Sequence, residues 1–209
     1  MWLRSLFAPG RSAGSPLRHL PPPQRRRPRL SLEGLEERAL PSSYAAAGVA
    51  DLIADINAAN AAGGSNTITL VAGTTFTLTA VDNTTDGATG LPVIAANDNL
   101  TIAGNGDTIA RSTASGTPAF RLFDVASSGS LTLNNLTLQG GLAFGAGASA
   151  EGGALYNQGT LILSGVIVHN NTVQGSTSQS AAGGGIYSAG SLTLQGCTIQ
   201  NNQAIGGQG

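Results

Sequence analysis

Few side chains in this sequence have the chemistry of a catalytic base, and they lie far apart. Lysine is absent, and after residue 41 the only arginines are Arg111 and Arg121. Proton abstraction beside a carboxylate, as in polysaccharide lyases, would have to use one of these two. Arg121 lies three residues before Asp124, and we expect these two side chains to form a surface ion pair, which contributes at most about 1 kcal/mol. The sequence therefore does not predict a lyase.

The carboxylates are also scattered. Glycoside hydrolysis needs two carboxylates on either side of the scissile bond. None of Asp98, Asp107, Asp124 and Glu151 is separated from another by the 30 or 31 residues at which the sequence repeats. We therefore predict that the chain is not an enzyme. A carbohydrate-active enzyme remains the alternative, and a carbohydrate-binding module, for which aromatic residues are few, is a third possibility.

Two short segments have some of the character of a calcium site. Residues 104–108 (Gly-Asn-Gly-Asp-Thr) match half of a calcium-binding repeat, but they occur once, and a structural turn is the favoured interpretation. Asp82, Asn83 and Asp86 form a second candidate. His169 has no second histidine in the folded part, and Cys197 occupies a repeat position that indicates a buried core residue. We assign no catalytic, cofactor-binding or metal-binding residue.

Composition divides the chain near Pro41. Residues 1–41 hold eight of the ten arginines and seven of the nine prolines, without the apolar stretch of an ordinary secretory signal. Two arginines against eight carboxylates give the rest a charge of −6. This charge, with few aromatic residues, argues against nucleic-acid binding, and no run approaches the ~18 apolar residues of a membrane helix. We expect residues 1–43 to be disordered or removed and residues 44–209 to fold.

The end of the first segment contains a recognisable pattern. Residues 32–42 read Leu-Glu-Gly-Leu-Glu-Glu-Arg-Ala-Leu-Pro-Ser. This resembles the planctomycete extracellular domain, a short N-terminal sorting motif of the form L-E-x-L-E-x-R-x-x-P-S. The resemblance implies export to the cell surface or beyond. The alternative is a disordered basic tail that touches anionic surfaces.

The folded part repeats itself. Residues 159–171 recur 31 positions later as 190–202, and a third copy begins 30 positions earlier at Gly129. Apolar residues alternate with Thr, Ser, Asn or Gln, as in strands with one buried face. The apolar residues align in columns: Leu131, Leu161, Leu192; Leu133, Leu163, Leu194; Leu136, Val166, Cys197; Leu138, Val168, Ile199; and, in a third strand, Val125, Leu155, Ile186.

Such columns pack when successive strands run parallel and in register, about 4.8 Å apart. The sequence therefore predicts an all-β fold, a right-handed parallel β-helix of about five rungs. Stacked asparagines, Asn170 over Asn201 and Asn171 over Asn202, would add hydrogen bonds along the stack. We expect loops at 81–98, 110–118, 141–152 and 172–184.

A helix is predicted ahead of the strands. Val49, Leu52, Ile53 and Ile56 follow helical spacing within residues 49–62, and two glycines at 63 and 64 can end the helix. We expect this amphipathic helix to cover the first rung, where an open β-helix would expose core side chains and unpaired backbone.

Several segments resemble bacterial surface β-helix proteins with polymorphic outer-membrane-type repeats. These are residues 55–60, 67–70 and 102–106 and the pair 152–157 and 183–188, with Val168 and Ile199 where that family has phenylalanine. The resemblance implies a secreted or cell-surface protein with a structural or adhesive, loop-presenting role. Its partner would be an unknown surface or matrix component, among which polysaccharide is one candidate. We expect no cofactor.

The last rung leaves a further expectation. The side chains of Leu192, Leu194, Cys197 and Ile199 would face solvent unless something covers them, and residues 200–209 have one bulky apolar side chain. Natural solenoids end in a capping repeat. We therefore expect either an incomplete product or a chain that self-associates end to end.

Overall fold

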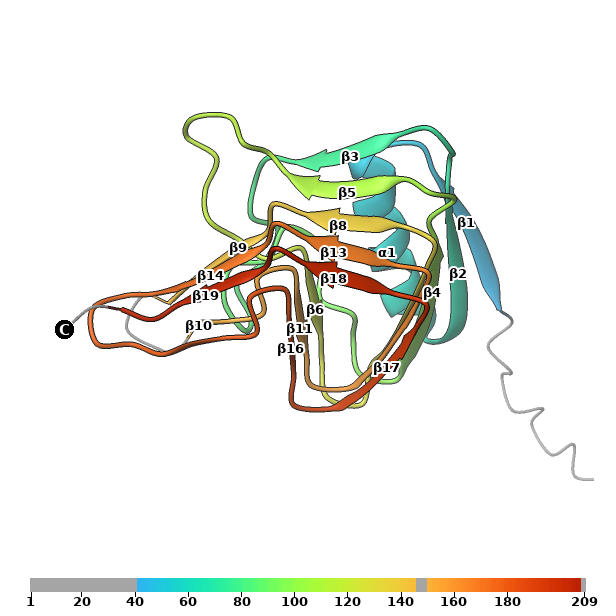
Figure 1. Ribbon diagram of the computed structural model, residues 1–209. Helices are drawn as coiled ribbons and strands as arrows, with labels where there is room; N and C mark the ends of the chain where they lie inside the picture. The colour runs from blue at the N-terminus through green and yellow to red at the C-terminus, as the bar shows by residue number, and fades with distance from the viewer. Residues whose placement is uncertain (1–40, 146–149, 208–209) are drawn as a thin grey trace, which may run out of the picture. The chain divides into compact units, whose positions relative to one another are not determined.

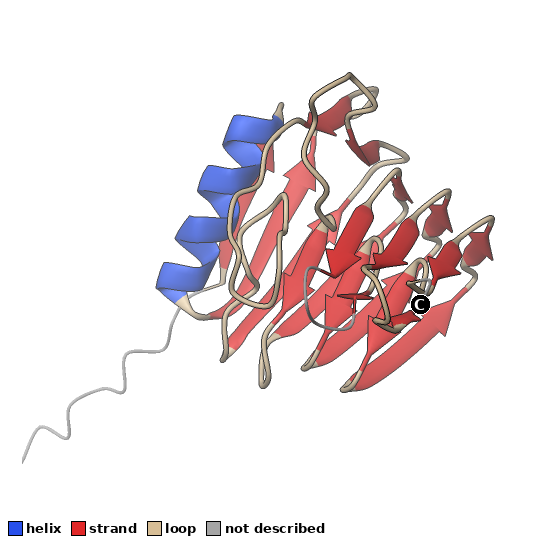
Figure 2. Cartoon of the chain, turned by 90° about the vertical axis from the view of Figure 1, so that its left-hand side faces the viewer, coloured by secondary structure: helices blue, strands red, loops and turns tan. Residues whose placement is uncertain are grey.

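The computed structural model describes residues 41–145 and 150–207, all within one compact unit, Glu37–Gly209. They form a parallel β-solenoid of about four turns with one helix at its N-terminal end (Figures 1 and 2). The sorting motif at 32–42 and the expected disorder of residues 1–43 fall almost entirely outside these residues. Only residues 41–43 of that segment are described. There the boundary is wrong by two residues, because Ser42 and Ser43 already belong to β1, paired with Asn66 and Thr67.

The largest face of the coil is a six-stranded parallel sheet. Its strands, in spatial order, are β1 (Ser42–Ala46), β2 (Gly64–Leu70), β4 (Asp98–Ala103), β7 (Ser130–Asn134), β12 (Thr160–Ser164) and β17 (Ser191–Gln195). The predicted columns through Leu161 and Leu163 are confirmed by the register of β7, β12 and β17. Leu161 and Leu163 are completely buried, while Thr160, Ile162 and Ser164, which alternate with them, are partly exposed.

The second and third faces have fewer strands. The second contains β3 (Thr75–Leu78), β5 (Thr108–Arg111), β8 (Thr137–Gln139), β13 (Ile167–His169) and β18 (Thr198–Gln200). The third contains β6 (Phe123–Val125), β11 (Leu155–Asn157) and β16 (Ile186–Ser188). The five-stranded second face matches the expected rung number, but the first rungs have no strand on the third face, so the coil makes about four turns.

One predicted column is wrong. Leu155 pairs with Phe123 and not with Val125, which lies beside Asn157. The reason is the corner that follows each third-face strand. Four residues separate β6 from β7, whereas two separate β11 from β12, so the register on this face is displaced by two positions. The longer corner is closed by a hydrogen bond from the Gly129 amide to the Ala126 carbonyl.

Helix α1 (Val49–Ala62) has the bounds that the sequence predicts. Leu52, Ile56 and Ala59 are completely buried, and Val49 and Ile53 pack against the same core. The helix contacts β1, β2, β3 and β4, and Figure 2 shows it across the N-terminal end of the stack. The helix therefore covers the first rung, where apolar side chains and strand edges would otherwise meet water.

Asparagines stabilise the corners as expected, but one pair does so differently. Asn171 Nδ2 donates to Asn202 Oδ1 at 3.0 Å, and both side chains also bond backbone groups of neighbouring turns. Asn170 and Asn201 instead have positive φ angles of 54°, which asparagine tolerates better than most residues. Their contribution is to the shape of the corner.

The segments predicted as loops at 141–152 and 172–184 each contain two short strands, which corrects that expectation. Strands β9 (Leu142–Gly145), β14 (Thr172–Gly175) and β19 (Gln203–Ile205) form one sheet, and β10 (Ala150–Glu151) and β15 (Ala181–Ala182) form another. Ala143, Ala150, Val173 and Ala181 pack between the two layers. We call this projection, on the left of Figure 1, the arm. Small side chains at the interface allow its layers to approach closely.

Candidate functional site

The main cluster of charged and aromatic side chains in the described residues surrounds Arg121 and Asp124. The expected surface ion pair is wrong, because Arg121 is 5% exposed and Asp124 is completely buried. Arg121 Nη1 donates to the backbone oxygen of Asp86 at 2.9 Å, and neither carboxylate oxygen of Asp124 has a hydrogen-bond partner. The attraction between the two charges is therefore purely electrostatic, without a direct hydrogen bond.

Residues 81–94 cover this pair by running parallel to residues 121–125, with isolated bridges from Thr89 to Arg121 and from Ile94 to Val125. The Gly90 amide donates to the Arg121 carbonyl at 2.9 Å, and the Ile94 amide donates to the Asp124 carbonyl at 2.9 Å. Gly90 has to be a glycine here, since an added Cβ would lie 2.6 Å from a ring carbon of Phe120. The covering segment could not be inferred from the repeat, because it precedes the regular rungs and has no counterpart in them.

Register aligns two tyrosines with the buried carboxyl group. Tyr156 pairs with Asp124 on one side and with Tyr187 on the other. The two tyrosine rings stack, with centroids 5.6 Å apart and planes 7° from parallel, and the Arg121 guanidinium lies 4.7 Å from the Tyr156 centroid. This cation–π contact adds a second restraint on Arg121. We call Arg121, Asp124, Tyr156 and Tyr187 the strip. The sequence pattern did not reveal it, because Asp124 and Tyr156 are 32 residues apart and the repeat has 30 or 31.

Burial is the main cause of the pKa shifts of Arg121, Asp124 and Tyr156. Burial, reinforced by the negative charge of Asp86 and opposed by Arg121, raises the pKa of Asp124 to about 6. Burial also lowers the pKa of Arg121 and raises that of Tyr156. The negative charge of Glu151, which also hydrogen-bonds the hydroxyl group, raises the pKa of Tyr187. A carboxyl group of pKa near 6 suits general acid catalysis, but this one has no surface in contact with solvent.

Arg111, the other candidate base, organises a loop. Its Nε and Nη2 atoms donate to the carbonyls of Pro118 and Thr117 at 2.8 and 3.0 Å. Its guanidinium also lies 5.6 Å from the centroid of the Phe120 ring. The side chain therefore holds the loop that follows β5, beside a shallow hollow of about 270 Å³ that also includes Gln139 and Asn170.

Of the calcium candidates, Asp107 has a structural role, as favoured from the sequence. Its Oδ1 accepts hydrogen bonds from the amides of Gly73 and Thr74, one rung earlier, at 2.7 and 2.9 Å. The side-chain amide of Asn83, in the second candidate, donates to the Leu91 carbonyl at 2.7 Å and closes a turn. Within the described residues no three His, Cys, Asp or Glu side chains come together in a way that could hold a metal ion.

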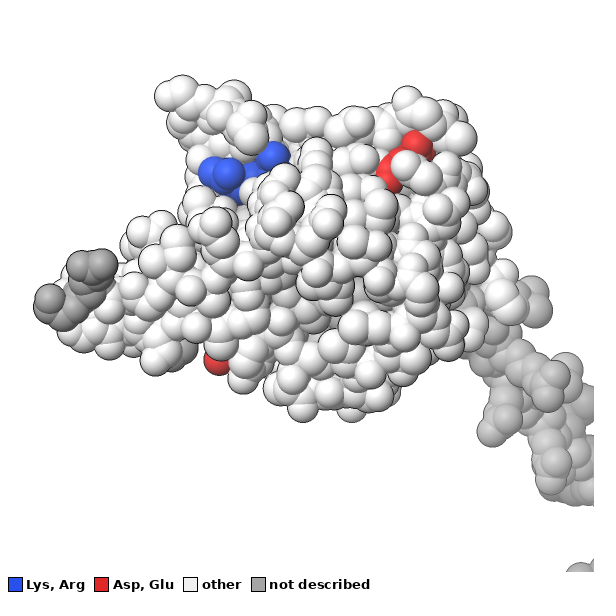
Figure 3. All heavy atoms as spheres, in the orientation of Figure 1, with Lys and Arg blue, Asp and Glu red and all other residues white. Residues whose placement is uncertain are grey.

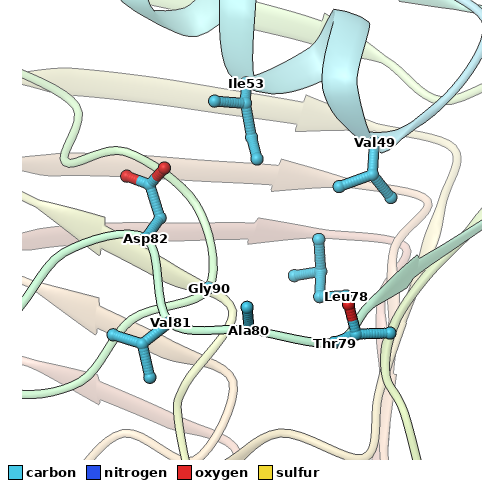
Figure 4. Close-up of a pocket in the computed structure, with 8 residues that line it drawn as sticks. All are labelled: Val49, Ile53, Leu78, Thr79, Ala80, Val81, Asp82 and Gly90. Atoms are coloured by element: carbon cyan, nitrogen blue, oxygen red, sulfur yellow. The ribbon is translucent and has the colours of Figure 1, made fainter.

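Asp82 lies at the edge of an apolar hollow of about 180 Å³ between α1 and the segment after β3 (Figure 4). Val49 and Ile53 point into it from the helix, and Leu78 and Ala80 from below. Burial raises the pKa of Asp82. Among the residues that line the hollow, only Thr79 and Asp82 have polar side chains, so it offers few groups to orient a ligand.

The outer face of the arm carries an exposed groove. Phe144, Gln174 and Ile205 form one column, because Gln174 pairs with both of its neighbours. Phe144 and Ile205 are 52% and 46% exposed. With Gly175, Ser176, Thr177, Gly206 and Gly207 these residues line a groove of about 460 Å³. The groove has no charged side chain among these residues, in line with the scarcity of charged atoms on the face shown in Figure 3.

Cys197 lies in its predicted repeat position but is only partly buried, which corrects the expectation of a buried core residue. It packs against the core, and its thiol donates to the Leu163 carbonyl at 3.3 Å. His169 is partly exposed at the end of β13. Leu192, Leu194 and Ile199 of the last rung are 38–47% exposed, as expected for strands without a covering element.

Comparison with protein families, with curated proteins and with solved structures finds no match for this chain. The fold alone defines the structural class of this protein, which is a parallel β-solenoid. No helix in the described part of the chain has the length and apolar character that crossing a bilayer requires.

Proposed function

We propose that this protein is exported and acts at the cell surface or outside the cell as a structural, adhesive β-solenoid that binds its partner through the arm. The observation that carries this proposal is the groove along Phe144, Gln174 and Ile205. Exposed apolar side chains in a row, on a rigid stacked sheet, are typical of an interaction surface. The side chains of Gln174 and Thr177 in the groove can add hydrogen bonds.

The chemistry of the groove favours an uncharged partner. An aromatic ring, an amide and small polar residues match the alternating apolar faces and hydroxyl groups of a neutral polysaccharide. Acidic polymers gain nothing here, because neither described arginine lines the groove. A neutral surface or matrix polysaccharide is therefore the partner that fits best.

Binding of the full chain to a panel of insoluble neutral and acidic polysaccharides tests this proposal. Phe144→Ala should weaken binding to a neutral polymer at least about tenfold, as truncation of an exposed aromatic anchor does. Ile167→Ala is the matched control, because Ile167 is 40% exposed on β13 and outside the groove. Equal affinity of the two variants, or no binding to any polymer, would contradict the proposal.

Export is tested separately. Residues 1–43, fused to a neutral reporter in a host related to the source, should send the reporter out of the cytoplasm. The same segment with Leu32, Leu35 and Arg38 changed to alanine is the control. Reporter that stays inside in both cases would overturn the sorting interpretation.

An enzyme of carbohydrates is the second candidate, favoured by the pKa of Asp124 near 6. Residues 81–94 would have to move before a substrate could reach this carboxyl group. Assays on acidic and neutral polysaccharides, with calcium present, decide between the two. Turnover that disappears in Asp124→Asn would establish the enzyme, whereas we expect none.

A further inference from the structure

A carboxylate lies buried at the C-terminal end of α1, where electrostatics disfavours it. Asp98, at the start of β4, is 2% exposed. The C-terminal end of a helix carries partial negative charge and attracts cations, yet the last turn of α1 has no basic residue. Burial raises the pKa of Asp98, and only hydrogen bonds from Asn66 and from the Asn99 amide lower it. Among the described residues, no positive charge therefore compensates this carboxylate.

Several oxygen atoms converge on the same place. Asn66 Nδ2 lies 3.0 Å from Asp98 Oδ1, 3.1 Å from the Gly63 carbonyl oxygen and 3.3 Å from the Ala59 carbonyl oxygen. An amide nitrogen has two hydrogens, so it cannot satisfy three acceptors fully. Asn66 is also 2% exposed, and its Oδ1 and the second oxygen of Asp98 have no hydrogen-bond partner.

We propose that Asp98, Asn66 and the carbonyls of Ala59 and Gly63 bind a hard metal cation, Na⁺ or Ca²⁺, beneath the C-terminal end of α1. In the bound form the Asn66 amide is rotated by 180°, which brings its oxygen to the position of the nitrogen. The Asn66 oxygen would then lie about 3.0–3.3 Å from each of the other three oxygen atoms, close to the spacing of neighbouring ligands around a cation with metal–oxygen distances of about 2.3–2.6 Å.

The ligand set indicates which cations fit. One carboxylate and three neutral oxygens balance a single positive charge, which suits Na⁺ or a weak Ca²⁺ site of the extracellular type, with Kd of about 10⁻⁴–10⁻³ M. Mg²⁺ fits poorly, because it demands near-ideal octahedral geometry and gives up water reluctantly. The bound ion would join the end of α1 to β2 and β4, and so fix the helix that covers the first rung.

The test is thermal unfolding of the full chain, stripped of metal by a chelator and titrated at pH 7.5 with CaCl₂, NaCl, MgCl₂ or choline chloride. At 100 times its Kd, Ca²⁺ or Na⁺ should raise the melting temperature by about 5 °C or more. Choline chloride controls for ionic strength. Equilibrium dialysis of the wild-type chain should find one ion per molecule, a readout that needs no variant.

Asp98→Asn should abolish both the saturable shift and the bound ion. Asp124→Asn is the matched control, since it removes a second buried carboxylate, outside the proposed site, and should leave the shift intact. Saturation with Ca²⁺ and not Na⁺, or the reverse, identifies the ion. A response no larger than that to choline chloride, with no ion in dialysis, would overturn the proposal and leave a protonated Asp98 bonded to Asn66 as the explanation.

Discussion

Replacing Asp124 by asparagine should stabilise the protein at neutral pH. The pKa of Asp124 in the folded protein is about 6, against an ordinary value of 3.8. A raised carboxyl pKa means that folding favours the protonated form. The stability that the protonated Asp124 contributes to the folded protein is therefore fully present below about pH 3.8 and is lost as pH rises through 6. Two pKa units correspond to about 3 kcal/mol, an order-of-magnitude figure for the destabilisation at pH 7.5.

Asparagine has nearly the shape of the protonated carboxyl group and carries no charge. The difference in unfolding free energy between Asp124→Asn and wild type should thus be near zero at pH 4 and grow to about 2–3 kcal/mol in favour of the variant at pH 7.5. Urea unfolding of both full chains between pH 4 and 8.5 measures it. Other carboxyl groups with raised pKa, such as Asp98, affect both proteins alike and cancel in the difference.

Asp107→Asn controls for the loss of a buried carboxylate as such. Asp107 accepts two backbone hydrogen bonds, so its replacement should destabilise by about 1–3 kcal/mol. A difference for Asp124→Asn that is flat across this pH range, or a variant less stable than wild type at pH 7.5, would refute the electrostatic reasoning. It would mean that water or Arg121 solvates the carboxylate in solution.

Three further predictions follow from the stacked rungs. Leu163→Asp should cost about 3 kcal/mol or more of unfolding free energy, because it buries an unpaired carboxylate, whereas Thr193→Asp on the exposed face should cost under about 0.5 kcal/mol; equal losses in urea unfolding would overturn the register. Gly153→Ala should lower the melting temperature strongly, since its Cβ would clash with the Gly184 carbonyl oxygen, while Gly48→Ala, with open space around the position, should change it little. The full chain should associate with increasing concentration through the exposed last rung, and a monomer at all concentrations in analytical ultracentrifugation would contradict this.

The regular part of the solenoid could be predicted because its inward side chains repeat. Leu131, Leu161 and Leu192 occupy one column in sequence and in space. The helix at 49–62 was predictable for the same reason, since its apolar residues follow a single period. Strand β1 was not, because its Ser-Ser-Tyr-Ala-Ala sequence has neither bulky alternation nor a counterpart in the repeats.

Irregular corners and small side chains are the reasons why the remaining parts of the fold could not be predicted from the sequence. Two extra residues after Val125 displaced the third face, and with it the pairing of Asp124 with Tyr156. The arm was mistaken for loops because its interior consists of alanine, valine and glycine, a composition that also occurs in flexible segments. The cluster joins Asn66 to Asp98, 32 residues later, at the place where the helix ends, and no local pattern encodes this.

The arm also determines how this protein could vary in length. Each of the last three rungs adds one strand to the arm sheet in register with its neighbour, so the column through Phe144, Gln174 and Ile205 lengthens by about 4.8 Å per such rung. Duplication of one 31-residue unit would therefore enlarge the groove by a fixed step without rearranging the core. The number of contacts with a long polymer, and hence the avidity, could be adjusted by copy number alone, with no change at any existing position.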